Sequence, residues 1–291
     1  MMKLCCGSNL YASFPLETAL REMSRIGFRY VDLWACKAIC DHADPKKTSP
    51  EEVRELLRRF DMTAVSMTLF LMTDEERRER MQFAAALGIP VVIWEPAQSP
   101  DWADNMTNLN PVSVPYGKPG RSLADYMSLL RQDLEYAKFL GLKIGIEVPH
   151  CYTLNEYLYQ IYQTDRRIDD DALAYIIAPP HANARGYEAE DVYRMIAPKR
   201  AYMLYLWDVK KGFSFPASDR AFGTGEEQMP GGGQRDFQAQ IEAFSQNGFS
   251  GWYNVSCHGT EGWDDLERVN ACLEKAFALV SPLIQEREGR G

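Results

Sequence analysis

The chain has 291 residues, of which 46% are hydrophobic and 25% are charged, a composition typical of folded proteins and not of disordered ones. Its formal net charge of −9 excludes the broad positive surface that attracts a nucleic-acid backbone. The N-terminal segment lacks the apolar core of a signal peptide and no apolar run is long enough to cross a bilayer. We therefore expect a cytoplasmic protein with neither nucleic acid nor membrane among its partners.

The seven cysteines form no CxxC pair, and their odd number argues against a fully paired disulfide framework. Free cysteine behaves as a small hydrophobic residue. We therefore expect mainly buried thiols at Cys5, Cys6, Cys36, Cys40, Cys151, Cys257 and Cys272.

From the N-terminus onwards, short runs rich in β-branched and aromatic residues alternate with longer amphipathic runs, as expected of βα units around a parallel sheet. The predicted strands span residues 3–6, 30–34, 63–67, 90–95, 143–148, 173–178, 201–207 and 251–257. The predicted helices span residues 15–27, 49–60, 74–88, 123–141, 154–163, 188–197, 235–248 and 263–280. Eight such units predict an α/β fold, a single (β/α)8 TIM barrel.

The ends of the predicted helices are marked in the sequence. Ser49 precedes Pro50 and stands three residues before Glu52, which predicts a capping box at the start of the second helix. Four glycines each follow a predicted helix and precede a strand: Gly27, Gly88, Gly141 and Gly248. The same helix stop, repeated along the chain, favours one architecture throughout.

No linker rich in Pro, Gly or Ser divides the chain, so we expect one domain over residues 1–291. The longest irregular segment, residues 97–122, follows the fourth predicted strand and contains Trp102 and Tyr116, whose rings are candidates for stacking on a bound ligand. A second long segment, residues 208–235, follows the seventh strand. Barrels build their sites from such βα loops.

Functional side chains of such barrels stand at the C-terminal ends of the strands. The polar residues predicted there are Asp32, Glu95, Glu147, His150, His181, Asp208, Cys257 and His258. All four histidines of the chain, counting His42, fall in predicted βα loops. These positions therefore define the candidate site.

Three segments carry motifs of a known family. LETALREMSRIGFRYVDLW is similar to its opening helix and second strand, and IGIEVPH at 144–150 to its fifth strand. PGGGQRDFQAQIEAFSQNGFSGWYNVS, from Pro230, is similar to its turn, helix and eighth strand. The chain resembles, over nearly its whole length, the xylose-isomerase-like barrels, which include sugar phosphate isomerases and epimerases, tagatose epimerase-like enzymes and apurinic endonucleases.

The resemblance also implies a metal site, because the family's epimerases hold one divalent ion with Glu, Asp, His and Glu from strands five to eight. Glu147 matches the first position, but the other three hold Ala178, Tyr205 and Ser256. Glu147 alone cannot supply the several oxygen or nitrogen ligands that Mn²⁺, Mg²⁺ or Zn²⁺ needs. We therefore expect a degenerate metal site.

Glu95 and Glu147 are the candidate catalytic residues. They lie on neighbouring predicted strands, which are about 4.8 Å apart, and close carboxyl groups share a proton or a cation. The alternative is that Glu95 is hydrogen-bonded to loop backbone or to an arginine.

Further residues are candidates for binding substrate, beginning with His181, which fits the family's substrate-binding histidine. The others are Asp208, His150, His258, Trp34 and Tyr205. Structural alternatives stay open for each kind of residue: a loop histidine can bond backbone carbonyls, Asp208 can cap the following loop, and tryptophans often pack in a core. The triple glycine 231–233 predicts either a phosphate held by backbone amides or a turn with positive φ.

Two functions remain. The resemblance implies a sugar or sugar phosphate isomerase/epimerase that binds a carbohydrate at the C-terminal end of the barrel, with Glu147 as acid/base. The substitutions at the metal positions favour instead a non-catalytic barrel, a pseudoenzyme serving as a carbohydrate-binding or partner subunit. The resemblance also implies association into a homo-oligomer, whereas four histidines and a net charge of −9 disfavour a nuclease.

Overall fold

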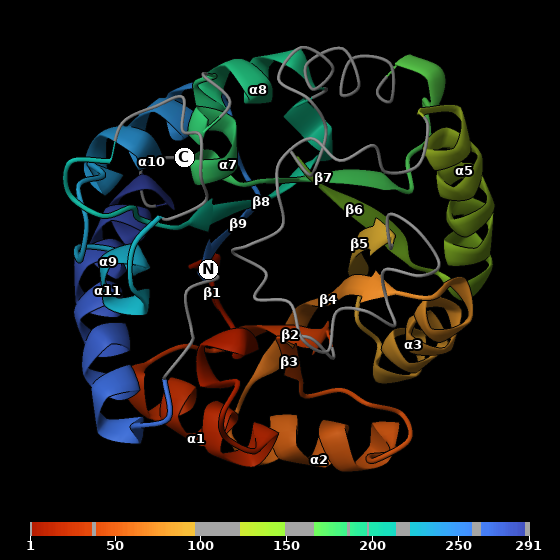
Figure 1. Cartoon of the computed structure of the whole chain (residues 1–291), viewed down its shortest axis with the longest axis horizontal. Coiled ribbons are helices and arrows are strands. Elements are labelled where there is room, and N and C mark those ends of the chain that lie inside the picture. Colours follow the sequence, from red (N-terminus) through yellow and green to blue (C-terminus); the bar gives the residue numbers. More distant parts are fainter. Residues whose placement is uncertain are drawn as a thin grey trace.

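The computed structural model describes residues 2–36, 39–96, 123–148, 166–184, 187–196, 198–213, 222–257 and 263–288. Within these residues, eight parallel strands form a closed barrel with helices around its outside (Figure 1). The order around the ring is β1, β2, β4, β5, β6, β7, β8 and β9, and the pairing of β1 with β2 closes it. The predicted α/β fold, a (β/α)8 barrel, is confirmed.

The strands coincide with the predicted ones. They are β1 (Leu4–Gly7), β2 (Tyr30–Cys36), β4 (Thr63–Met72), β5 (Val91–Pro96), β6 (Lys143–Val148), β7 (Leu173–Ile177), β8 (Ala201–Leu206) and β9 (Trp252–Val255). A short strand, β3 (Cys40–Asp41), pairs antiparallel with the end of β2. It is too short to have a recognisable sequence pattern.

The helices of the described ranges pack around this ring. They are α1 (Leu16–Ile26), α2 (Pro50–Arg59), α3 (Asp74–Leu87), α5 (Leu123–Leu140), α7 (Pro179–Ala184), α8 (Ala189–Met195), α9 (Gly225–Gln228), α10 (Phe237–Gln246) and α11 (Leu266–Glu288), with short 3-10 helices at Ser8–Tyr11 and Pro198–Arg200. The helix predicted at 154–163 lies outside the described residues. None of the described helices is both long and apolar enough to cross a membrane.

The helix-end signals at Ser49 and at four glycines are confirmed by hydrogen bonds and backbone angles. Ser49 Oγ accepts from the Glu52 amide at 3.2 Å, and Glu52 Oε2 accepts from the Ser49 amide at 2.7 Å. The four glycines that end helices all have positive φ, a conformation that a Cβ atom disfavours: Gly27, Gly88, Gly141 and Gly248.

Several elements besides β3 differ from the sequence-based expectation. α9 was not predicted, and α11 continues to Glu288, eight residues beyond its predicted end at 280. β4 continues to Met72, five residues beyond its predicted end at Met67, because the apolar run persists until Thr73 caps α3. α7 was not predicted, since its sequence PPHANA is short and opens with two prolines, which a helix tolerates only in its first turn. This short helix carries His181.

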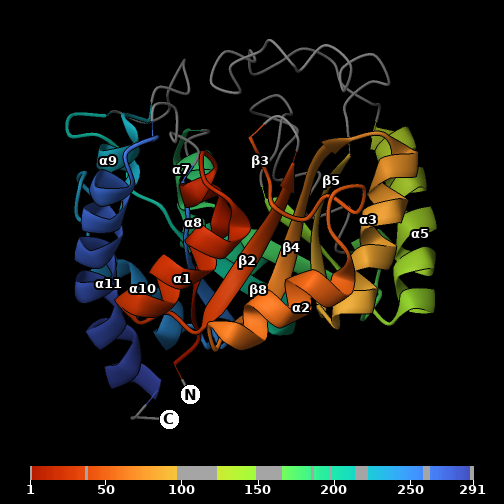
Figure 2. The same ribbon diagram turned by 90° about the horizontal axis from the view of Figure 1, so that it is seen from below.

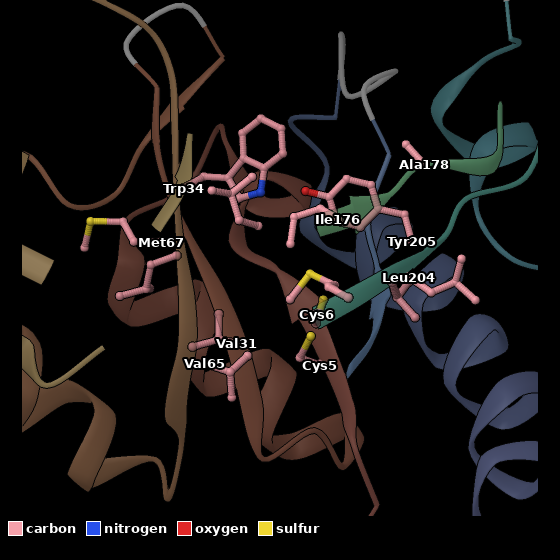
Figure 3. Packing of buried hydrophobic residues seen from close by; sticks show 14 of the residues in the cluster. Cys5, Cys6, Val31, Trp34, Val65, Met67, Ile176, Ala178, Leu204 and Tyr205 are labelled. Carbon is pink, nitrogen blue, oxygen red and sulfur yellow. The ribbon is translucent and has the colours of Figure 1, made fainter. Parts of the chain in front are cut away.

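Six described cysteines are free thiols, and all but Cys272 are buried, as predicted. Cys151 lies outside the described residues. Cys5 and Cys6 belong to the barrel wall shown in Figure 3, together with Val31 and Val65.

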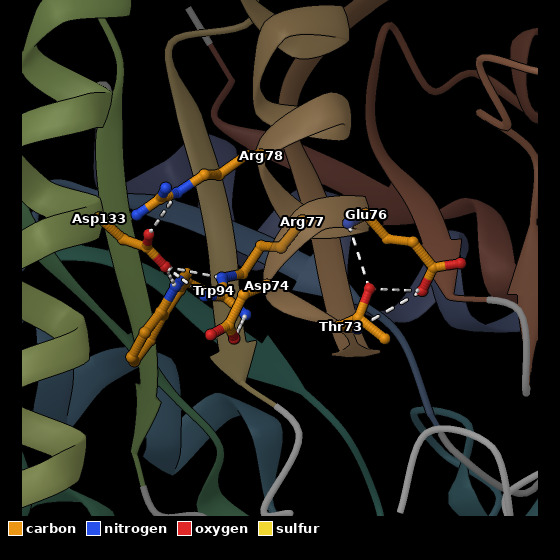
Figure 4. Close-up of polar contacts among 7 residues, drawn as sticks. All are labelled: Thr73, Asp74, Glu76, Arg77, Arg78, Trp94 and Asp133. Carbon is orange, nitrogen blue, oxygen red and sulfur yellow. Dashed lines mark hydrogen bonds and ion pairs between the residues drawn. The ribbon is translucent and has the colours of Figure 1, made fainter. Parts of the chain in front are cut away.

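A buried ion pair joins two outer helices to the barrel (Figure 4). Asp133 of α5 accepts from Arg77 Nε of α3 at 2.7 Å and from Trp94 Nε1 of β5 at 2.8 Å. The Arg77 and Asp133 side chains are both fully shielded from solvent. The Arg77 guanidinium also lies 5.6 Å from the centre of the Trp94 ring. One carboxylate thus holds α3, α5 and β5 together.

Replacing Asp133 with alanine is expected to lower the free energy of unfolding by about 3–5 kcal/mol, because it removes the buried partner of Arg77 and leaves this charge only the half-exposed carboxylate of Asp74. Urea denaturation measures this loss. The matched control is Glu55→Ala, which removes the exposed pair of Glu55 with Arg58 on α2 and should change stability far less. If both variants lost the same free energy of unfolding, the stabilising role of the buried Asp133 would be contradicted.

Candidate functional site

The strands run toward the end of the barrel that carries β3 and α7, the upper end in Figure 2. Five residues highlighted by the sequence are buried at this end: Trp34, Glu147, His181, Tyr205 and Ser256. Trp34 on β2 and the Tyr205 hydroxyl on β8 point toward one another across the barrel (Figure 3). The C-terminal rim therefore brings together residues from strands far apart in the sequence.

Glu147 and His181 form the centre of the site. His181 Nε2 lies 3.5 Å from Glu147 Oε1, and neither side chain is more than 3% exposed. The imidazole packs edge-on against Trp207, with ring centroids 4.9 Å apart, and against Phe222 at 5.7 Å. These contacts fix the ring, so the carboxylate and the imidazole meet in a rigid, water-poor setting.

Asp32 is a buried carboxyl group inside the barrel, below the rim. Its two oxygens accept from Ser66 Oγ at 2.7 Å and Thr68 Oγ1 at 2.8 Å, both from β4. Burial raises the pKa of Asp32 from 3.8 to about 6, although hydrogen bonds from these hydroxyls lower it. The sequence placed Asp32 among the polar residues of the candidate site but predicted no catalytic or binding role for it.

Tyr205 stands close to both carboxyl groups. Its burial raises the pKa of the phenol well above 10, and the negative charges of Glu147 and Asp32 raise it further. The phenol therefore stays protonated and is able both to donate and to accept a hydrogen bond.

The residues described here do not fit a divalent metal. Ala178 has no ligand atom, and the phenol of Tyr205 stays protonated. The Ser256 hydroxyl donates to Asn9 Oδ1 at 3.0 Å. Over the described ranges, no group of three His, Cys, Asp or Glu side chains is placed to hold a metal ion. The side chain of Glu95, and His150 and His258, lie outside those ranges.

Asp208 organises the loop that follows β8. Its carboxylate accepts from five backbone amides, those of Val209, Gly231, Gly233, Gln234 and Arg235, at 2.8 to 3.2 Å. A Cβ atom at Gly233 would lie 2.0 Å from the Val209 carbonyl oxygen, which accounts for glycine there. Of the two alternatives for the triple glycine, the turn is observed, and amides of residues 231 and 233 already bind a carboxylate.

The backbone places the predicted glutamate pair on adjacent strands. Trp94 of β5 is the register partner of Ile146 of β6, and Glu95 and Glu147 directly follow these two residues. The two glutamates thus occupy equivalent positions on neighbouring strands. Trp102 and Tyr116, in the loop 97–122, lie outside the described residues.

Comparisons with known proteins agree with this fold. A family model described as xylose isomerase-like TIM barrel matches residues 20–272. No curated protein matches the chain in sequence.

Similar solved structures carry several activities in their names. The IOLI protein with a bound zinc atom is 17% identical with a TM-score of 0.71, and the match covers 98% of this chain and 99% of that one. D-allulose 3-epimerase from Methylomonas sp. is 14% identical with a TM-score of 0.64, covering 97% and 98%. The probable 3-DHS dehydratase AsbF from Bacillus anthracis is 11% identical with a TM-score of 0.65, covering 96% and 98%. At these identities the likeness shows the fold alone.

The raised pKa of Asp32 predicts a pH dependence of stability. Between pH 3.8 and about pH 6, the Asp32 carboxyl group is protonated more fully in the folded state than in the unfolded state. The free energy of unfolding therefore falls as the pH rises through that interval. The difference between these two pKa values corresponds to about 3 kcal/mol of stability. In Asp32→Asn this component of the slope should disappear, as measured by urea denaturation at a series of pH values.

The control is Asp61→Asn, because the Asp61 side chain is 91% exposed. This variant should keep the wild-type dependence on pH. A wild-type slope retained by Asp32→Asn would contradict the assignment to Asp32.

Proposed function

The chain belongs to the xylose isomerase-like TIM barrel family, and from this premise we propose that it is a sugar or sugar phosphate isomerase/epimerase-like protein that binds a carbohydrate at the C-terminal end of its barrel. The observation that carries the proposal is the buried contact of 3.5 Å between Glu147 and His181. Isomerases and epimerases of carbohydrates move a proton at a carbon that carries or adjoins an oxygen. This step needs a positioned carboxylate to move the proton and a neighbouring side chain to form a hydrogen bond with the substrate oxygen.

Glu147 is the proposed acid/base. Water is excluded around it, which strengthens its interactions with a bound substrate. His181 and Tyr205 hold substrate oxygens, and the protonated phenol donates to an oxygen on which negative charge develops. Trp34, which packs edge-on against Phe70 with centroids 5.5 Å apart, provides a rigid apolar wall.

Glu95, His150 and His258 keep their predicted roles, whereas Asp208 takes the structural role that was its alternative. Glu95 is the second carboxyl group, on the strand next to Glu147, and His150 and His258 are substrate contacts. Asp208 acts on the site by holding the loop after β8.

A divalent ion such as Mn²⁺, Mg²⁺ or Zn²⁺ would polarise a sugar oxygen if one were bound. Since the described side chains do not fit such an ion, we propose a degenerate metal site and assign the proton transfer to the side chains alone.

The second candidate is a non-catalytic barrel that binds a carbohydrate or a partner subunit. Ala178 and Ser256 favour it, because neither supplies the ligand that the family resemblance implies. For either function we propose a small carbohydrate ligand, association into a homo-oligomer and, because the six described cysteines are free thiols, a cytoplasmic location.

The test of the first candidate is exchange of carbon-bound hydrogen in D2O, followed by NMR over a panel of ketoses and their phosphates. Wild type is expected to exchange one position of one substrate. Glu147→Gln should slow this exchange by about 10² to 10⁴-fold, the usual contribution of an acid/base group. The matched control, Glu75→Gln on the exposed face of α3, should exchange at the wild-type rate.

Calorimetric titration of the same sugars separates the two candidates. Binding without exchange by wild type supports the non-catalytic function. The absence of both binding and exchange would overturn both proposals.

A further inference from the structure

A second concave site lies at the opposite end of the barrel, where the strands begin. Its volume is about 430 Å³, and residues near the N-terminal ends of β1, β6, β7, β8 and β9 line it. We call it the basal cleft and define it by Lys3, Lys143, Lys199, Arg200, Tyr202 and Trp252. Small-molecule sites commonly measure about 300–1,000 Å³, so the cleft has room for a small metabolite.

Positive charge gathers in this cleft although the whole chain carries a net charge of −9. Four cationic side chains line it, against one acidic residue, Asp171. Arg200 also forms an ion pair with Asp169, whose side chain is 88% exposed. Counting Asp169, two more cations than acids surround the cleft, and a concave, low-dielectric wall concentrates their field.

The cations are held at different depths. Arg200 is buried, and Lys3 Nζ donates to the Ser250 carbonyl oxygen at 2.6 Å. Lys143 and Lys199 are exposed at the edge of the basal cleft. Lys199 Nζ lies 3.5 Å from the carboxylate of Asp171, whose side chain is 92% exposed. Two ammonium groups can therefore approach an entering anion without a large rearrangement.

Two half-buried aromatic residues give the cleft a fixed wall. The ring of Trp252 packs on Tyr30 with centroids 4.6 Å apart. The Tyr202 hydroxyl donates to the Val65 carbonyl oxygen across the barrel at 2.6 Å. A ligand that carries an apolar or planar part beside its charge would find a preformed surface here.

We propose that the basal cleft binds a small phosphorylated molecule. Lys143 and Lys199 contact its phosphate, and the positive charges of Arg200 and Lys3 add to the attraction. Lysine ammonium groups bind phosphate as point charges. The aromatic wall then contacts the remainder of the ligand. The site is separate from the proposed carbohydrate site, so either proposal stands if the other fails.

The experiment is isothermal titration of the full chain with inorganic pyrophosphate, ribose 5-phosphate and AMP. Saturable binding is expected, and the variant Lys143→Ala/Lys199→Ala should bind about tenfold more weakly or worse, the change produced by about 1.4 kcal/mol. The control, Lys46→Ala/Lys211→Ala, makes the same change in charge at exposed positions outside the cleft and should bind as wild type. Melting temperatures confirm that both variants fold.

The three probes distinguish the sources of the phosphate. If AMP binds more tightly than the other two probes and Trp252→Leu abolishes this difference, the ligand is a nucleotide. If all three probes bind equally, the cleft recognises only the phosphate group. No saturable binding of any probe would overturn the proposal. So would equal weakening in the control variant, which would show a diffuse effect of charge, or unchanged affinity in Lys143→Ala/Lys199→Ala.

Discussion

Closure of the barrel between β1 and β2 is the constraint on which the other features depend. Cys6 pairs with Val31 and Gly7 with Asp32, so neither strand is left with an open edge. Because the eight strands of the ring are parallel, closure gathers all their C-terminal ends at one rim and all their N-terminal ends at the other. The buried carboxyl groups and the basal cations consequently lie at opposite ends of one rigid ring.

The neighbouring seam between β1 and β9 accounts for the serine at position 256. A Cβ atom on Gly7 would lie 2.4 Å from Asn9 Oδ1 and 2.8 Å from Ser256 Oγ, so the backbone of β1 passes close to both side chains. Asn9 accepts from Ser256 at 3.0 Å and donates to the Cys257 carbonyl oxygen at 2.5 Å. Ser256, which directly follows β9, thus bonds to the 3-10 helix after β1, and a glutamate there would have to displace Asn9.

Features set by local interactions are predictable from the sequence, and features set by distant partners are not. The capping box at Ser49 and the positive φ of Gly88 depend on a few adjacent residues, and both are confirmed. Asp32 and Asp208 look alike in sequence, since each is a single acid in or directly after an apolar strand. Hydroxyls from β4 bond to the first, whereas the second accepts from the adjacent Val209 amide and from four amides more than twenty residues away. Only the folded structure shows that Asp32 is enclosed inside the barrel and that Asp208 holds a loop in place.

The pattern of retained and replaced residues favours a ligand at the rim. The positions implied for holding an ion contain Ala178, Tyr205 and Ser256, but Glu147 remains, buried and in contact with His181. A buried carboxylate lowers stability unless its neighbours compensate for lost hydration, and an apolar residue of similar size would avoid that cost. The surrounding side chains also hold His181 rigidly, with Trp207 in turn donating to Gln228 at 2.9 Å. The preorganised polar pair therefore supports the proposed polar ligand at the C-terminal end of the barrel, whether or not that ligand is turned over.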